Sequence, residues 1–230
     1  MNSLFAKPVF WKLVFFCLPV FYCLYYAPYG INETDGGFLT GLAWQLECEK
    51  RLYADVLYVR PPLPVWLRWL ELNLLPENWA VLGERWIFYG KVALYAALGA
   101  AVLIREKGAA RWMLACFGFV LSAHCYPAAA WHTVDGILFS VLSIWCLTNC
   151  TAKSGAILSG LFIAAAVLCK QSFYPVLLVW IAFLFYFYKF YKKQNSKLWL
   201  ALGSMCLAAA LFFLYLKFQN LLPRFWQLTS

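Results

Sequence analysis

Eight of the ten carboxylate side chains of this chain lie between Tyr29 and Glu84, in a stretch that is flanked by strongly apolar sequence. The eight are Glu33, Asp35, Glu47, Glu49, Asp55, Glu71, Glu77 and Glu84, and the other two acids are Glu106 and Asp135. A carboxylate within hydrogen-bond reach of a hydroxyl group can accept its proton. Grouped carboxylates can also bind a cation. The cluster therefore predicts a site for proton transfer or for cation binding.

Asp35 is the first candidate for a general base, because Gly36 and Gly37 follow it and permit the close approach of a substrate. The same tripeptide is also typical of a turn in which the aspartate caps a helix. Glu33 lies two residues earlier and is a candidate substrate-binding group.

Asp55 and Asp135 are the other two catalytic candidates. Asp55 lies in "LYADVLYVRPPL", where it either positions a ligand or forms a salt bridge with Arg51 or Arg60. Asp135 lies where apolar sequence resumes, in "HTVDGILF". An ionisable group at such a boundary usually faces the protein interior or an aqueous cavity. The alternative is an aspartate that is favoured at a helix start by the helix dipole.

The elements that must position these residues are transmembrane helices. The chain is 64% hydrophobic and 13% charged, with a mean hydropathy of +0.69, as is typical of a polytopic membrane protein. A span needs about 20 apolar residues to cross about 30 Å of hydrocarbon. The sequence thus predicts an all-α polytopic membrane protein with about seven transmembrane helices, at 8–28, 82–104, 112–127, 136–152, 155–171, 174–191 and 198–217.

The basic residues predict the orientation of these spans. With a cytoplasmic N-terminus, all of the following cations fall on the cytoplasmic side: Lys7, Lys12, Arg105, Lys107, Arg111, Lys153, Lys189, Lys192, Lys193 and Lys197. The formal charge of +9 therefore indicates the membrane surface as partner, and no nucleic acid. Residues 29–81 become a long first extracytoplasmic loop, in which "GGFLTGLAWQLECE" and "PLPVWLRWLELNLL" are too short to cross and are expected to form two interfacial helices.

Four cations, Arg60, Arg85, Lys91 and Lys170, fall on or near the outer side, where the positive-inside bias does not explain them. Lys91 lies inside a span and needs an anionic partner, such as a lipid phosphate or Asp135, unless it extends to the interface. Arg85 can offer a bidentate fork to phosphate or pair with a nearby glutamate. His132 can join Asp35 and Asp135 as a ligand of a divalent metal, although a histidine near such a boundary is often structural.

The order of these features resembles a known family. A first span is followed by "TDGGFLTGLAWQLECEKRLYADVLYVRPPLPVWL", "GERWIFYGKVALYAALGAAVLIRE", "YPAAAWHTVDGILFSVL" and "SGLFIAAAVLCKQSF". This order resembles the N-terminal seven-helix module of the C-fold (GT-C) membrane glycosyltransferases, nearest the branch of protein O-mannosyltransferases and aminoarabinose transferases. The resemblance covers essentially the whole of 1–230 as a single module and implies that the C-terminal module of the family is absent.

The resemblance implies transfer of a sugar from a polyprenyl-phosphate carrier to an acceptor on the extracytoplasmic face, in an integral protein of the bacterial inner (plasma) membrane. By the resemblance, Asp35 takes the position of the family's first-loop acid, which makes it the expected base, and Asp135 takes that of a second acid. The family often has two adjacent acids where this chain has Thr34 and Asp35, so Glu33 is a possible substitute and a divalent metal is an open expectation. A second polypeptide is an expected partner if one completes the C-terminal half. The alternative function is a non-catalytic scaffold or flippase subunit that binds polyprenyl-phosphate lipid.

Overall fold

The computed structural model describes residues 7–29, 35–129, 131–191 and 195–229, and the regular elements in these ranges are helices. The α-helices are α1 (Pro8–Tyr25), α2 (Asp35–Glu47), α3 (Leu63–Leu74), α4 (Ala80–Leu103), α5 (Ala109–Cys125), α6 (His132–Asn149), α7 (Lys153–Val167), α8 (Tyr174–Phe185), α9 (Asn195–Phe218) and α10 (Leu222–Thr229). Short 3-10 turns η2 (Glu77–Trp79) and η3 (Gln171–Phe173) precede α4 and α8, and a π-helical turn η4 (Tyr186–Tyr191) extends α8. The all-α prediction is confirmed.

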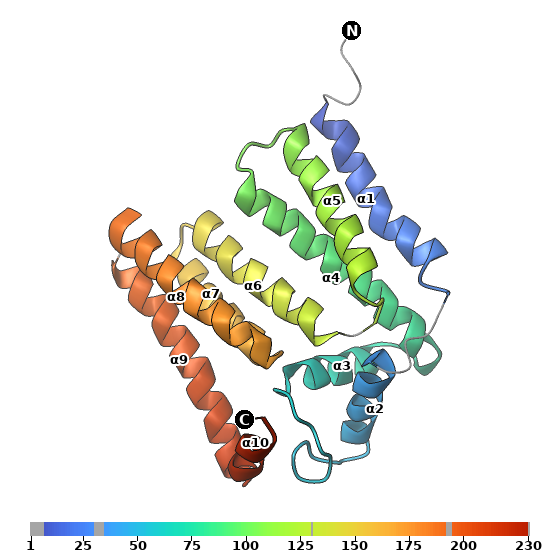
Figure 1. Cartoon of the computed structure of the whole chain (residues 1–230), viewed down its shortest axis with the longest axis vertical. Coiled ribbons are helices and arrows are strands. Elements are labelled where there is room, and N and C mark those ends of the chain that lie inside the picture. The colour runs from blue at the N-terminus through green and yellow to red at the C-terminus, as the bar shows by residue number, and fades with distance from the viewer. Residues whose placement is uncertain (1–6, 30–34, 130, 192–194, 230) are drawn as a thin grey trace.

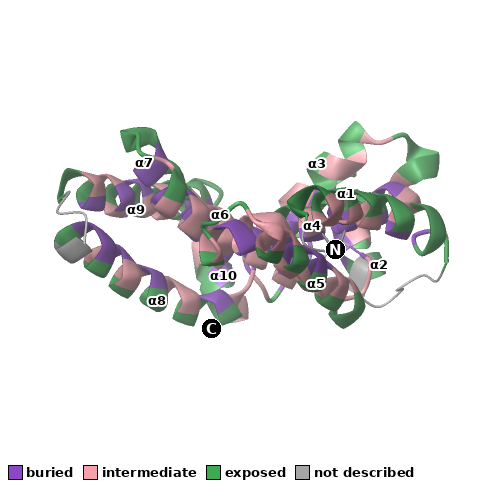
Figure 2. Cartoon of the chain, turned by 90° about the horizontal axis from the view of Figure 1, so that it is seen from above, coloured by how far each residue is buried: buried purple, intermediate pink, exposed green. Residues whose placement is uncertain are grey.

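The long helices lie roughly side by side, whereas α2, α3 and α10 gather at one end of them (Figure 1). Seen along the other direction, α7, α8 and α9 occupy one side of the molecule and α1, α4 and α5 the other, with α6 between them (Figure 2). In agreement with this view, α6 packs against α4 on one side and α7 on the other.

Helices occupy each of the seven predicted ranges, but only four helical segments of the described chain are long and apolar enough to cross a membrane. These are Pro8–Tyr25, Glu77–Leu103, Gln171–Lys189 and Asn195–Phe218. The apolar helices α5 and α7 have 17 and 15 residues. At 1.5 Å per residue they reach about 25 Å and about 22 Å, short of the hydrocarbon thickness of about 30 Å. The structure thus supports an integral membrane protein with four candidate spans.

The outer faces of these helices are apolar. Leu13 on α1 and Leu178 on α8 are 61% and 68% exposed. A large apolar surface of this kind is unusual for a soluble monomer and suits contact with lipid.

Close helix packing joins α7 to α9. A Cβ atom on Gly160 would lie 2.1 Å from the carbonyl oxygen of Ala201 and 2.2 Å from Oγ of Ser204. Glycine is therefore needed at this position for the two backbones to approach, a frequent device where helices pack in membranes.

The segment between α2 and α3 is held against the rest of the chain by hydrogen bonds. Gln171 donates its side-chain N–H to the carbonyl of Val59 at 2.8 Å, and Leu63 donates its backbone N–H to the carbonyl of Leu168 at 3.2 Å. From α10, Arg224 donates to the carbonyl of Ala54 at 2.6 Å. These bonds fix the segment that carries Tyr58 and Arg60 beside the connection between α7 and α8.

Candidate functional site

A chain of alternating charges links α3, α4 and α6 near the end at which α2 and α3 gather. Lys91 Nζ lies 2.7 Å from Asp135 Oδ1 and 2.7 Å from Glu71 Oε1. Arg68 Nη1 lies 3.5 Å from Glu71, and Arg68 Nη2 lies 2.8 Å from Glu84. We call these five residues the ion-pair chain. Arg68, Glu84 and Asp135 are buried, so each charge depends on the others for its compensation.

Arg68 is the best-enclosed member of the ion-pair chain, with 0% exposure. Its Nε donates to Thr40 Oγ1 of α2 at 3.0 Å, and its Nη2 donates to the carbonyl of Ala80 at 2.8 Å. Thr40 in turn donates to Glu84 at 3.1 Å. One guanidinium thus ties together α2, α3 and α4, which a planar fork of five N–H donors can do and a lysine cannot.

A second polar group lies at the N-terminal end of α6 and contains Tyr58, Arg60, His132 and Lys170, which we call the basic cluster. Arg60 donates a hydrogen bond to Nε2 of His132, and Lys170 Nζ donates to Thr133 Oγ1 at 3.3 Å. Thr133 directly follows His132 in the chain, so both cations lie at the first turn of α6.

Two buried polar atoms of the basic cluster have no hydrogen-bond partner among the described residues: the hydroxyl of Tyr58 and Nδ1 of His132. Both residues are 1% exposed. Because Nε2 of His132 accepts from Arg60, a neutral imidazole carries its proton on Nδ1, which is then a donor. Burial is the main cause that raises the pKa of Tyr58, so its phenol keeps its proton and is also a donor. Two donors without acceptors beside two cations favour an anionic ligand.

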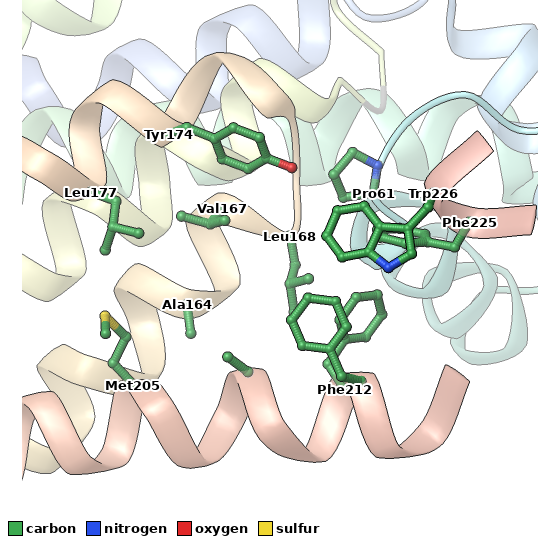
Figure 3. Close-up of a pocket in the computed structure, with 12 residues that line it drawn as sticks. Pro61, Ala164, Val167, Leu168, Tyr174, Leu177, Met205, Phe212, Phe225 and Trp226 are labelled. Atoms are coloured by element: carbon green, nitrogen blue, oxygen red, sulfur yellow. The ribbon is translucent and has the colours of Figure 1, made fainter. Parts of the chain in front are cut away.

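An apolar groove of about 320 Å³ lies next to this cluster, between α7, α8, α9 and α10 (Figure 3). Its wall includes Phe212, Phe225 and Trp226. Pro61 also lines the groove and directly follows Arg60, and Leu168 and Tyr174 line it on either side of Lys170 in sequence. The segments that supply the cations of the basic cluster therefore also supply part of the groove wall.

The structure brings some of the predicted site residues together. Lys91 contacts Asp135, one of the two partners expected for it, and the basic cluster unites Arg60, His132 and Lys170.

Four predicted residues lie elsewhere or are not fully described. Arg85 donates to the carbonyls of Ala27 and Tyr29, where it binds the end of α1 and the residues that follow it. Asp55 accepts from the backbone N–H of Arg51 at 2.9 Å and from its guanidinium at 3.4 Å, which is the salt-bridge alternative in an exposed turn. Asp35 is the first residue of α2, but its side chain and the whole of Glu33 lie outside the described part of the chain.

Sequence reasoning missed Arg68, Glu71 and Tyr58. Arg68 and Glu71 lie in "WLRWLEL", where an arginine and a glutamate three positions apart are typical of an exposed helix face. The spacing does not indicate that these two side chains contact Glu84 and Lys91 of α4.

Tyr53 and Tyr58 are the two tyrosines between α2 and α3, and both are buried. Tyr53 donates to the carbonyl of Arg60, whereas the hydroxyl of Tyr58 has no partner among the described residues, a difference that the sequence does not indicate.

A divalent metal fits poorly between Asp135 and His132. Asp135 already contacts Lys91, Nε2 of His132 already accepts from Arg60, and Lys170 contacts the neighbouring Thr133. Among the described residues there is also no group of three or more histidine, cysteine or acidic side chains arranged to hold a metal ion. The cations Arg60 and Lys170 make the surroundings of His132 better suited to an anion than to a metal ion.

Comparison of the chain with protein-family models, curated proteins and solved structures finds no match.

Proposed function

We propose that this chain binds a polyprenyl-phosphate-linked sugar and acts as a glycosyltransferase module of the GT-C type on the extracytoplasmic face of a bacterial inner membrane. The observation that carries the proposal is the basic cluster, with its two buried donors that lack acceptors, beside the apolar groove. A lipid phosphate has the matching parts: an anionic head that accepts hydrogen bonds and a long apolar tail.

The topology in this proposal has seven crossings and a cytoplasmic N-terminus. In Figure 1, successive connections between the long helices lie alternately at one end of the helix layer and at the other, which supports this topology. Eight of the 19 lysine and arginine residues lie in or next to the connections that follow α4, α6 and α8, whereas α2, α3 and α10 lie at the opposite end. The short helices α5 and α7 cross in this proposal with local thinning of the bilayer.

In the proposed reaction, an acceptor hydroxyl attacks C1 of the sugar and the bond from C1 to the phosphate oxygen breaks. The lipid phosphate leaves with the bonding electron pair. Arg60 and Lys170 stabilise its charge, and His132 and Tyr58 donate hydrogen bonds to its oxygens. Asp35 accepts the proton of the attacking hydroxyl, a role that rests on its position in the sequence.

A second candidate function is a non-catalytic carrier-lipid binder, such as a scaffold or a flippase subunit. It is favoured by the observation that both catalytic candidates with described side chains already have cationic partners, Asp135 with Lys91 and Asp55 with Arg51. Neither carboxylate is then available as a base in the structure as it stands.

Both functions require carrier binding, which can be measured with the full chain in nanodiscs and radiolabelled undecaprenyl phosphate. Replacement of Arg60 or Lys170 by glutamine should weaken binding by about tenfold, since a hydrogen bond to a charged group contributes about 1.5–3 kcal/mol. Lys217→Gln is the matched control, because it removes an exposed cation from the end of α9 and is not a member of the basic cluster. Equal loss in the control would contradict the proposed phosphate site.

The two functions are separated by a transfer assay with a polyprenyl-phosphate sugar donor and the natural membrane as the source of acceptor. Asp35→Asn should lower transfer by roughly 100-fold or more and leave carrier binding intact, because it removes a proton acceptor of similar size. Full transfer by this variant would eliminate Asp35 as the base. Carrier binding by the wild-type chain without any transfer would favour the non-catalytic function.

A further inference from the structure

A second candidate binding site lies at the opposite end of the helices from the basic cluster. It is a hollow of about 340 Å³ between the start of α1 and the start of α5. Its lining residues are Pro8, Val9, Lys12, Lys107, Arg111 and Trp112, and we call it the basic hollow.

The basic hollow is strongly positive. Lys12, Lys107 and Arg111 form no ion pair within the described part of the chain, and the ammonium group of Lys12 lies 5.9 Å from the ring centroid of Trp112. Arg105 adds a further cation to the connection between α4 and α5, where Glu106 is the single acid. Like charges that converge on one hollow repel one another unless an anion neutralises them.

The ends of the two helices reinforce this charge. Neither α1 nor α5 has a side-chain cap at its N-terminus, and neither has an acidic residue in its first turn. Both helices therefore direct the positive ends of their dipoles toward the region of the hollow without a protein carboxylate to balance them.

Exposed apolar surface continues from the hollow along both helices. On α1, Val9 lines the hollow, and Leu13 and Phe16 follow it on the same face. On α5, Met113 and Phe117 are exposed one turn apart. A ligand with an anionic head and apolar chains matches both surfaces at once, and a free phosphate matches only the first.

We propose that the basic hollow binds the phosphate group of an anionic phospholipid, whose acyl chains lie along the exposed faces of α1 and α5. The site is independent of the proposed transferase function, because it shares no residue with the basic cluster or with the apolar groove. In this proposal the Trp112 ring, which lines the hollow, lies between the headgroup and the acyl chains, the depth that tryptophan prefers in membrane proteins.

The test is native mass spectrometry of the full chain in detergent, with added dioleoyl phosphatidylglycerol or dioleoyl phosphatidylcholine. We expect the anionic lipid to bind about tenfold more tightly than the zwitterionic lipid, a preference that Lys107→Gln/Arg111→Gln removes. Lys153→Gln/Lys197→Gln is the matched control, because it removes two cations from the same end of the helices and leaves the hollow intact. It should keep the preference within about twofold.

Three outcomes would overturn the proposal. Equal binding of the two lipids would remove the anionic preference, and equal loss in both double variants would assign it to general surface charge. Displacement of phosphatidylglycerol by millimolar glycerol 3-phosphate would identify a soluble phosphate as the ligand.

Lys12→Gln is a second variant, which removes the cation that α1 contributes to the hollow. It should also reduce the preference for the anionic lipid. Size-exclusion profiles and helical circular dichroism that match the wild-type chain show that each variant is folded.

Discussion

The replacement of Arg68 by methionine tests the central packing of this structure. Methionine fills most of the volume of the arginine side chain but supplies no charge and no hydrogen-bond donor. The variant leaves Glu84, whose side chain is 7% exposed, without the guanidinium that lies 2.8 Å away. It also deprives the carbonyl of Ala80 of its side-chain donor. Loss of one partner of a buried ion pair costs about 3–5 kcal/mol, so we expect a fall of this size in the free energy of unfolding.

The loss should depend on the charge left behind on Glu84. Addition of Glu84→Gln to Arg68→Met should therefore recover about 1–3 kcal/mol, because the buried group that remains is then neutral. The measurement is equilibrium unfolding of the purified chain in mixed micelles, followed by circular dichroism. Arg51→Gln is the control, since the exposed pair of Arg51 and Asp55 should contribute less than about 1 kcal/mol. The reasoning is refuted if Arg68→Met unfolds like the wild-type chain, or if the double variant is less stable than Arg68→Met.

Three further predictions concern other parts of the structure. Tyr58→Phe should weaken undecaprenyl-phosphate binding by about three- to tenfold while the unfolding free energy of the free protein stays the same or rises, because it removes a buried hydroxyl without a partner. Gly160→Leu should lower the free energy of unfolding by more than about 2 kcal/mol, because the new side chain clashes with α9. The control Gly203→Ala places its Cβ atom in open space and should change the free energy of unfolding by less than about 1 kcal/mol in the same assay. In single-cysteine variants, Cys48 and a cysteine introduced by Ser196→Cys should react with impermeant maleimide from opposite sides of the membrane, and labelling from one side would contradict the proposed topology.

The sequence by itself determined the helices and their approximate limits. Long apolar runs with basic residues at their ends indicate the helices of the layer. A stretch of about 13 residues reaches only about 20 Å as a helix, so the two apolar segments of the first loop were expected to be short helices that do not cross. They match α2 and α3 closely. The helix after α9 was not predicted. The segment "LPRFWQLTS" is short, and its helix depends on the packing of Phe225 against Tyr53 and Phe212, which lie in distant parts of the chain.

Only the tertiary structure decided which polar residues meet. The sequence left Lys91 with a lipid phosphate or Asp135 as alternative partners and Asp55 with a functional or a local role, since spacing along a chain does not state which helix faces are turned toward each other. The packing of α3 on α4 and of α4 on α6 brings Arg68, Glu71 and Asp135 into one buried chain of charges. The hydrogen bonds between the first loop and the connection from α7 to α8 place Arg60 and Lys170 beside His132. These contacts join residues up to 112 positions apart, which no local pattern in the sequence relates to one another. In the buried ion-pair chain each charge has lost its water, so it depends on the partners that only the helix packing supplies.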